Sequence, residues 1–485
     1  MIQSIGYLAI LPVLIVSVAA VAVLLADAFG APAKAVGGLT AVSLIAAAVA
    51  LPFGHGRSTF CAAATRAGEH VSCSYVADDF TVLFQAVVLL AAIVVVLLSH
   101  GEMRRSALPV GEYHFLLLAA ILGALLLAAG RDLITLVVAL ETLSLPVFAL
   151  VALRRYDGTA SEAALKLFLV SVVSSAVTLF GISLVYGVTG AMHLDRVAAG
   201  LTRVHGDLRP VAAAGIVLTV AGFGFKIAAV PFHFWAPDVY QGSPLPVAAF
   251  LSVVSKAGGF AGLTLVLTAG FWPYGHTWGP LMGVLAAATM TLGNLLALRQ
   301  TDAVRLLAWS SVAQSGYILA PMAGGAHVRP HQWMTATAAY VAMYAIMNIG
   351  AFAVVTVAAR RGIRDLESYR GLARANPGSG LALAFFLLCL AGLPPGVMGL
   401  LAKVVVFRAA VGGAATWLAV IMAVNTVIGL YYYLTWATRL FAAGKARRVR
   451  AGRAGGVAIA VALAAAVVVS AAPELVLHAA ALAVP

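Results

Sequence analysis

Apolar stretches about as long as a membrane-spanning helix recur from one end of this chain to the other, with only short polar segments between them. A helix needs roughly 20 mainly apolar residues to cross the hydrocarbon core of a bilayer. Of the 485 residues, 63% are hydrophobic and only 10% are charged, a composition that excludes a soluble globular protein. The sequence therefore predicts an all-α membrane protein, surrounded by the lipid bilayer and without a separate soluble domain.

Runs bounded by charged residues, glycine and proline predict about fourteen transmembrane helices. We expect them to begin near residues 4, 34, 78, 112, 131, 162, 210, 244, 276, 304, 332, 379, 412 and 455. The first run is about as long as a full span and has neither a basic segment before it nor a clear cleavage site. It is therefore expected to be a retained helix and not a removed signal peptide.

Basic residues indicate the topology of these helices. A formal net charge of +13 would suggest nucleic-acid binding in a soluble protein, but here Lys and Arg lie in short loops, so no nucleic-acid partner is expected. Loops after odd-numbered helices hold about 18 Lys and Arg and the others about 8, largely because of segments 360–374 and 439–453. Basic loops stay in the cytoplasm and the predicted helix number is even, so both termini are expected to be external.

No redox or nucleotide-binding motif is evident in the sequence. Cys61, Cys73 and Cys389 are scattered, and their spacing fits neither a zinc site nor an iron–sulfur cluster. Neither a Gly-rich phosphate-binding loop nor a dinucleotide-binding fingerprint is found. The chain is therefore expected to carry no cofactor, and the energy for any transport must come from partner subunits or from an ion gradient.

Two predicted helices contain proline where a spanning helix should be continuous. Their sequences are GFGFKIAAVPFHFW (222–235) and LAGLPPGVMGLLAKVVVF (390–407). Because proline has no N–H, Pro231 leaves the carbonyl of Ile227 without its helical partner, and Pro394 and Pro395 do the same to the carbonyls four residues before them. Freed backbone groups at membrane depth need protein or water partners, so both breaks are expected to line an internal, partly hydrated cavity.

The spacing of the two breaks suggests an internal repeat. They lie about five helices apart, as expected of two five-helix repeats with inverted topology. The predicted parts are N-terminal helices 1–3 in residues 1–111, a first repeat in 112–270, a second repeat in 271–441, and a C-terminal loop and helix in 442–485.

Four ionisable side chains lie well inside predicted spans: Glu141, Lys226, Lys256 and Lys403. Each costs about 2.5 to 3.5 kcal/mol at a helix centre, so each needs an explanation. A static buried ion pair of Glu141 with Lys226 is the structural alternative, but it leaves Lys256 and Lys403 without acidic partners in their own spans. We therefore interpret the four residues as a proton relay.

An ion pair that moves apart changes how tightly its lysine holds a proton. At an effective dielectric near 20, opposite charges about 4 Å apart attract by about 4 kcal/mol, and charges about 10 Å apart by roughly 1.7 kcal/mol. The difference is comparable to the about 2.3 kcal/mol per charge required for transport against each 100 mV of membrane potential. Our hypothesis is that a moving Glu141–Lys226 pair releases protons toward Lys256 and Lys403.

Several segments resemble the subunit N family of the NADH-quinone oxidoreductases, or respiratory complex I. They are ALETLSLPVFALVALRR, EAALKLFLVSVVSSAVTLFGISLVYGVTG, KIAAVPFHFWAPDVYQGSPLPVAAFLSVVSKAGGF and LGNLLALRQTDAVRLLAWSSVAQSGYIL. The resemblance extends from about 112 to 440. It implies a proton-pumping subunit of a bacterial inner membrane, next to other antiporter-like subunits of the complex. It also implies that NADH, FMN, iron–sulfur clusters and quinone are bound by partner subunits.

The same resemblance assigns roles to individual residues. Glu141 and Lys226 match the family's ion pair, Lys256 the central relay lysine, and Lys403 the lysine of the second broken helix. Lys166 in SEAALKLFLV matches a further lysine of the sixth helix. Snorkelling, or pairing with the glutamate four residues before it, explains Lys166 equally well.

His233 lies in the matching PFHFW segment, where a structural histidine beside the break is at least as good an explanation as proton transfer. The chain departs from the family pattern at two positions. Gln314 stands in SSVAQSGYIL where the family often has histidine, and glutamine cannot titrate. Gly396 follows Pro395 where a hydroxyl residue is common. These differences suggest a divergent second copy of the subunit and put full pumping activity in doubt.

Three other functions fit parts of the pattern. One is a multisubunit cation/proton antiporter driven by an ion gradient. Another is a purely structural subunit whose buried charges hold helices in register. The third is a membrane-bound hydrogenase or formate-linked complex, which uses similar subunits with a different electron donor.

Overall fold

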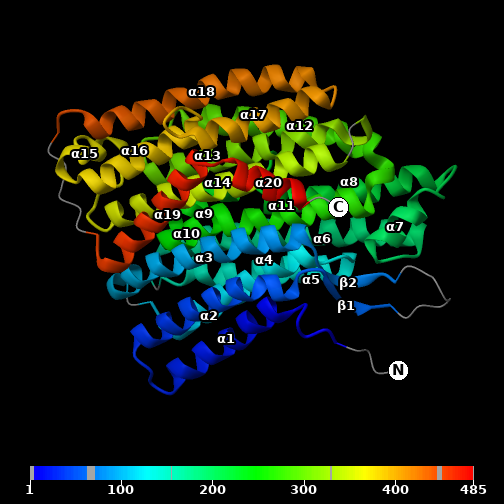
Figure 1. Ribbon diagram of the computed structural model, residues 1–485, viewed down its shortest axis with the longest axis horizontal. Coiled ribbons are helices and arrows are strands. Elements are labelled where there is room, and N and C mark those ends of the chain that lie inside the picture. Colours follow the sequence, from blue (N-terminus) through cyan, green and yellow to red (C-terminus); the bar gives the residue numbers. More distant parts are fainter. Residues whose placement is uncertain are drawn as a thin grey trace.

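The computed structural model describes residues 5–62, 71–106, 108–154, 156–327, 330–444 and 451–483, and most of them are helical (Figure 1). Within these residues, 12 helical segments are long and apolar enough to cross a membrane. The predicted all-α membrane fold is therefore confirmed. The number of fourteen spans stays a prediction, because helix α13 and the pair α16 and α17 are too short to be counted as spans by length alone.

The helices of the first half are α1 (Leu11–Ala28), α2 (Ala33–Gly54), α3 (Asp79–Ser106), α4 (Val110–Ala129), α5 (Leu133–Ala152), α6 (Gly158–Thr189), α7 (Leu194–Leu201), α8 (Leu208–Lys226), α9 (Trp235–Gly242), α10 (Leu245–Phe250), η1 (Leu251–Ser255), α11 (Lys256–Leu265) and η2 (Val266–Gly270). The helices of the second half are η3 (Trp272–Tyr274), α12 (Gly275–Ala297), α13 (Ala303–Leu319), η4 (Ala320–His327), α14 (Pro330–Ala359), η5 (Leu366–Tyr369), α15 (Leu372–Ala375), α16 (Pro377–Ala391), α17 (Val397–Gly412), α18 (Thr416–Phe441), α19 (Arg453–Ala471) and α20 (Glu474–Leu482).

Helix α1 begins at Leu11, so the predicted start near residue 4 is wrong. Pro12 occupies its first turn, where the missing N–H costs no helical hydrogen bond. Before the helix, the Gly6 amide donates to the Thr59 hydroxyl at 2.9 Å. This hydrogen bond links the residues before α1 to a β-hairpin, so they do not extend the helix.

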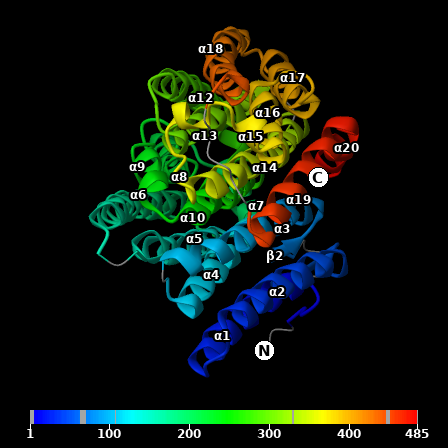
Figure 2. The same ribbon diagram turned by 90° about the vertical axis from the view of Figure 1, so that its left-hand side faces the viewer.

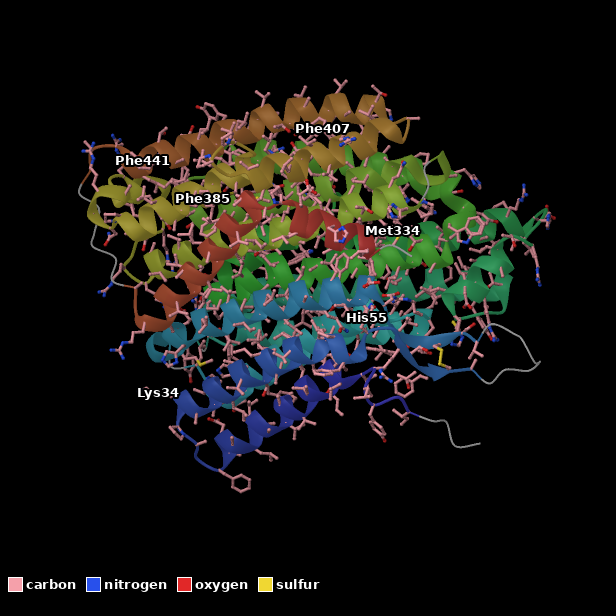
Figure 3. The ribbon with its side chains drawn as sticks, viewed as in Figure 1. Lys34, His55, Met334, Phe385, Phe407 and Phe441 are labelled. Atoms are coloured by element: carbon pink, nitrogen blue, oxygen red, sulfur yellow. A yellow bond between two sulfur atoms is a disulfide. The ribbon has the colours of Figure 1, made fainter. Side chains whose placement is uncertain are left out.

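The hairpin consists of β1 (Arg57–Cys61) and β2 (Cys73–Ala77), which pair antiparallel. Cys61 lies opposite Cys73 and forms a disulfide with it, visible as a yellow bond in Figure 3. Neither the hairpin nor the disulfide was predicted from the sequence, where the spacing of the cysteines was weighed only for metal binding. Cys389 is a free thiol buried in α16.

The two ends of the bundle differ in character. The hairpin and α7 lie at one end, and α1 begins and α20 ends toward it (Figure 1). Lys34 and Phe441 lie toward the opposite end in Figure 3, where α15 also lies in Figure 1. The Arg-rich segment 360–374 belongs to this second end, together with the described part of 439–453; residues 445–450 lie outside the described residues.

Two segments form the buried centre of the bundle. One runs from α10 through η2 (Leu245–Gly270) and the other is α14, and nearly all of their residues are buried. Helices α1 and α2 lie at one edge of the bundle and α17 and α18 at the other (Figure 2). In each predicted repeat the fourth helix is broken: α8 continues as α9, and α16 continues as α17. The boundaries of the two repeats, 112–270 and 271–441, stay a prediction.

Candidate proton-transfer site

The first predicted helix break is confirmed. Helix α8 ends at Lys226, and the helix resumes at Trp235 as α9. The Ile227 carbonyl, which Pro231 frees, accepts a hydrogen bond from the Ser315 hydroxyl of α13 at 2.8 Å. A side chain therefore satisfies the backbone group that the break exposes.

Lys226 is buried beside this break, with only 6% of its surface exposed. Its Nζ donates to the Ser144 hydroxyl of α5 at 2.9 Å. The Ser144 hydroxyl in turn donates to the Leu140 carbonyl at 2.6 Å. Ser144 follows Glu141 by one helical turn, so the acidic residue and the lysine's partner lie on one face of α5.

Glu141 is half-buried and accepts a short hydrogen bond from the Ser175 hydroxyl of α6. Glu141, Ser144 and Ser175 line one small pocket, and Ser144 also lines the neighbouring pocket that contains Lys226. Among the described residues, no ion pair within 4 Å joins Glu141 to Lys226. The two predicted partners thus lie around Ser144 without direct contact.

Lys256 is the most deeply buried of the lysines, with 1% of its surface exposed. It begins α11, between the π-helical segments η1 and η2. Its Nζ donates to the Ser311 carbonyl at 2.5 Å and to the Ser315 hydroxyl at 2.8 Å, both on α13. Short π-helical segments inside helices often mark functional positions.

The second predicted break is also confirmed, because α16 ends at Ala391 and α17 begins six residues later. Lys403 is 6% exposed, and its Nζ donates to the freed Ala391 carbonyl at 2.6 Å. The Leu390 carbonyl, freed in the same way, accepts from Nε2 of Gln314 at 3.4 Å. The break near Lys403 is therefore closed by protein donors, as the first break is.

The expected enclosed cavity is only partly correct. The first break does line a small pocket, formed by Lys226, Trp235 and neighbouring residues. Pro231, Pro394 and Pro395, however, lie exposed on the surface of the chain. The freed carbonyls of the breaks are enclosed, because side chains of α13 and α17 bind them.

Gly396 has a steric reason to lack the expected hydroxyl. A Cβ at this position would lie 2.7 Å from the Cα and N atoms of Cys389. Such a distance is shorter than real carbon contacts allow, so any side chain would push α17 away from α16.

Gln314 stands at the centre of a buried polar network between Lys256 and Lys403. Its Nε2 also donates to the Tyr433 hydroxyl at 3.2 Å, and its Oε1 accepts from the Tyr340 hydroxyl at 2.6 Å. Tyr433 also hydrogen-bonds to Ser310. The glutamine thus uses both N–H groups and its oxygen in the position where the family pattern often has histidine.

Lys166 differs from the buried lysines, because 45% of its side chain is exposed. It pairs with Glu162 at 2.7 Å, the alternative that the sequence left open, and with Asp238 at 2.8 Å. Asp238 also pairs with Arg305 at 3.0 Å. Asp238 was not predicted as a site residue, although it lies in the APDVYQG stretch that carries the resemblance.

His233 is 6% exposed and lies in the irregular segment after the first break. Its ring centroid is 5.5 Å from that of Trp309 and 4.9 Å from that of Phe234. Its Nδ1 has no hydrogen-bond partner within the described part of the chain. The geometry fits both roles that the sequence allowed.

Hydroxyl residues are the main part of the site that sequence reasoning missed. Ser144 and Ser315 bind the lysines through their hydroxyls and Ser311 binds Lys256 through its backbone carbonyl, yet only charged side chains were predicted from the sequence. The signal was present in the sequence, because ETLS in α5 and SSVAQS in α13 concentrate small polar residues in otherwise apolar spans.

Comparisons with known proteins agree with this architecture. Residues 130–429 match the family described as NADH:quinone oxidoreductase/Mrp antiporter, TM. NADH-quinone oxidoreductase subunit N 2 of Streptomyces griseus is 55% identical over 454 residues, or 91% of this chain and 84% of that protein. A chain of respiratory complex I from Thermus thermophilus with bound aureothin has a TM-score of 0.79 and 33% identity, covering 96% of this chain and 98% of that chain.

A chain of the Mrp complex from Dietzia sp. DQ12-45-1b has a TM-score of 0.84 and covers 99% of this chain and 97% of that one. At 20% identity, it shows a likeness of fold alone. The high identity and coverage are found with subunit N proteins. This chain belongs to the subunit N family of the NADH-quinone oxidoreductases.

Proposed function

We propose that this chain translocates protons across the membrane as subunit N of an NADH-quinone oxidoreductase, with quinone reduction in partner subunits as the energy source. Membership of the subunit N family supports proton translocation as the function of this chain. Family membership also supports the proposal that partner subunits bind NADH, FMN, iron–sulfur clusters and quinone. It likewise supports other antiporter-like subunits as the neighbours of this chain.

One observation carries the proposal that Glu141, Lys226, Lys256 and Lys403 move the protons. The three lysines are 1–6% exposed, and each donates to neutral serine or backbone oxygens. Within the described residues no carboxylate forms an ion pair with any of them. Because an unpaired buried charge is costly, groups that exchange a proton explain their presence better than fixed structural charges do.

The contacts suggest an order for the relay. Lys226 and Ser255, the neighbour of Lys256, line the same pocket, so a hydroxyl or a water molecule there can bridge the two lysines. From Lys256 the serines of α13 lead toward Gln314 and its tyrosine partners, and from there to the break that holds Lys403. Gln314 cannot titrate, so protons pass this position through hydroxyl groups or water.

Ser144 provides a mechanism for the moving pair. In this structure Lys226 donates to the neutral Ser144 hydroxyl, while Glu141 accepts from Ser175. We propose a second arrangement in which Lys226 turns to Glu141, which strengthens its hold on the proton. Alternation between the two partners would then set when Lys226 passes its proton on.

Lys166 and His233 have secondary places in this proposal. The exposed Lys166, with Glu162 and Asp238, forms a charged group at a helix end, where protons can be collected from water. His233 lies beside the first break with an Nδ1 that no other described residue binds, so it can exchange a proton there.

We further propose a bacterial inner-membrane location with both termini external. The Arg-rich segment 360–374 lies at the end expected in the cytoplasm, opposite the hairpin (Figure 1). Disulfides persist in oxidising compartments, so the Cys61–Cys73 disulfide supports an external position for the hairpin.

Purification of the assembled complex tests the function. We expect this chain to co-purify with NADH- and quinone-binding subunits, and the complex in proteoliposomes to translocate protons when NADH is added. Lys226→Ala should slow this translocation by at least about tenfold, a barrier change of about 1.4 kcal/mol. Lys34→Ala, at an exposed helix start, is the control. Sodium-dependent proton flux from an assembly without NADH-binding subunits would favour a cation/proton antiporter instead.

A further inference from the structure

Two adjacent residues of α13 contact the two helix breaks. The Ser315 hydroxyl donates to the Ile227 carbonyl at the first break, and the Gln314 amide donates to the Leu390 carbonyl at the second. Both carbonyls are those that proline frees, and both side chains are almost fully buried. Successive residues of a helix point about 100° apart, so α13 stands between the breaks and holds each from a different side.

Ser315 also links the first break to Lys256. Its hydroxyl accepts from Lys256 Nζ at 2.8 Å and has one proton of its own to donate. While Lys256 is charged, that proton is available to the Ile227 carbonyl, as observed, or to the Ser311 carbonyl at 3.1 Å. A neutral Lys256 has a lone pair and can accept the same proton, which would leave the Ile227 carbonyl without its donor.

Gln314 cannot titrate, so it can affect the second break only through the position of its hydrogen bonds. Both N–H groups are used, on Leu390 and Tyr433, and its oxygen accepts from Tyr340. The carbonyl next to that of Leu390 binds Lys403 at 2.6 Å. A shift of Gln314 would therefore move the acceptor on which Lys403 depends.

We propose that Ser315 and Gln314 form a positioning bridge, through which the protonation of Lys256 controls the geometry of both helix breaks. The bridge rests on the proposed function in one respect, namely that Lys256 gains and loses a proton. The coupling of the two breaks is a property of the hydrogen bonds alone, and it can be measured without transport.

Hydrogen exchange in the assembled complex tests the coupling. In Gln314→Leu we expect faster amide exchange in peptides covering 392–397, and also in peptides covering 227–234, which Gln314 does not touch. Ser315→Ala should give the reciprocal result, faster exchange at 227–234 and also at 392–397. Each increase should be about five- to tenfold, as expected for the loss of roughly one buried hydrogen bond.

Gln85→Leu is the matched control. Gln85 of α3 is buried and donates to the Tyr75 hydroxyl at 3.2 Å and to the Leu125 carbonyl at 3.0 Å, so its bonds resemble those of Gln314. Its loss should leave exchange at both breaks unchanged. Gln314→Met keeps the side-chain length and replaces Gln314→Leu if that variant does not assemble.

Proton translocation provides a second measurement. If the bridge acts as one unit, the double variant should be no more than about twofold slower than the slower single variant. Two results together would overturn the bridge. The rate losses of the two single variants would multiply in the double variant, and hydrogen exchange would change only at the break next to each substitution. If the wild-type complex translocates no protons but its breaks exchange as a coupled pair, the proposed function fails and the coupling of the two breaks through Ser315 and Gln314 stands.

Discussion

At the scale of single residues, three buried lysines share one kind of partner. Lys226 donates to a serine hydroxyl, Lys403 to a backbone carbonyl, and Lys256 to one of each. Neutral acceptors of this kind stabilise an ammonium group without fixing it, whereas a carboxylate partner would hold the proton more firmly. Glu141 lies close enough to share a pocket wall with Ser144, so it can intervene without being a permanent partner.

Ser144→Ala tests this arrangement at the residue scale. The substitution removes the neutral partner of Lys226 and leaves Glu141, which lines a pocket with Ser144, as the proposed alternative partner. We expect NADH-driven proton translocation to slow by about five- to tenfold, corresponding to loss of one hydrogen bond of about 1 to 1.4 kcal/mol. Dye quenching in proteoliposomes measures the rate.

Ser99→Ala is the control for Ser144→Ala. Ser99 of α3 is also buried and hydrogen-bonds to Tyr113 at 2.7 Å, so its loss costs a similar bond far from the helix breaks. Translocation in Ser144→Ala equal to that in Ser99→Ala would show that Lys226 does not need its serine.

At the scale of the helices, the two breaks carry the site. Each break ends one helix beside a lysine and frees carbonyls that side chains of α13 or α17 then bind. The close contact of α16 and α17 requires Gly396, because a Cβ there would lie 2.7 Å from the Cys389 backbone. The packing of the break, and not only its hydrogen bonds, is therefore specific.

Gly396→Ala tests the packing. We expect the variant to be less stable by about 1 to 3 kcal/mol, the typical cost of overpacking a buried contact. A lower thermal unfolding midpoint of the purified complex would show this loss. Gly412→Ala, at the other end of α17, meets no atom within 4 Å and should leave the midpoint unchanged. Equal midpoints for the two variants would contradict the proposed contact.

The sequence allowed the helical class, the two breaks and the buried lysines to be predicted. The effect of proline on a helix and the cost of a charge in hydrocarbon depend only on the local sequence. The helix breaks at residues 226–231 and 391–395 could therefore be predicted without a structure. The hydrogen-bond partners of the lysines could not be predicted, because Ser144 and Ser315 are far from the lysines in sequence. Many serines in apolar spans bond only to their own helix. The hairpin was missed because its short strands interrupt a long series of helices.

At the scale of the whole molecule, the two ends of the bundle differ in a way that supports the proposed orientation. One end carries the disulfide-linked hairpin and α7, and the other carries the Arg-rich segment 360–374 (Figure 1). Positive loops are retained in the cytoplasm and disulfides form outside it, so two independent chemical rules favour the proposed orientation.

Cysteine labelling of intact cells tests the orientation. After mild reduction, a membrane-impermeant maleimide should label Cys61 and Cys73 from outside, and no label is expected without reduction. Cys389 is buried in α16 and should stay unlabelled in the folded protein, so Cys61→Ser combined with Cys73→Ser serves as the blank. Labelling that appears only after the cells are permeabilised would place the hairpin in the cytoplasm.

The central claim is that buried lysines pass protons through this chain, and Lys256 gives the most direct test because it is the most deeply buried. The measurement is NADH-driven proton translocation by the assembled complex carrying Lys256→Ala, with subunit content verified. We predict a rate at least about tenfold below wild type, equivalent to about 1.4 kcal/mol in the barrier. A wild-type rate in the fully assembled variant would contradict the account.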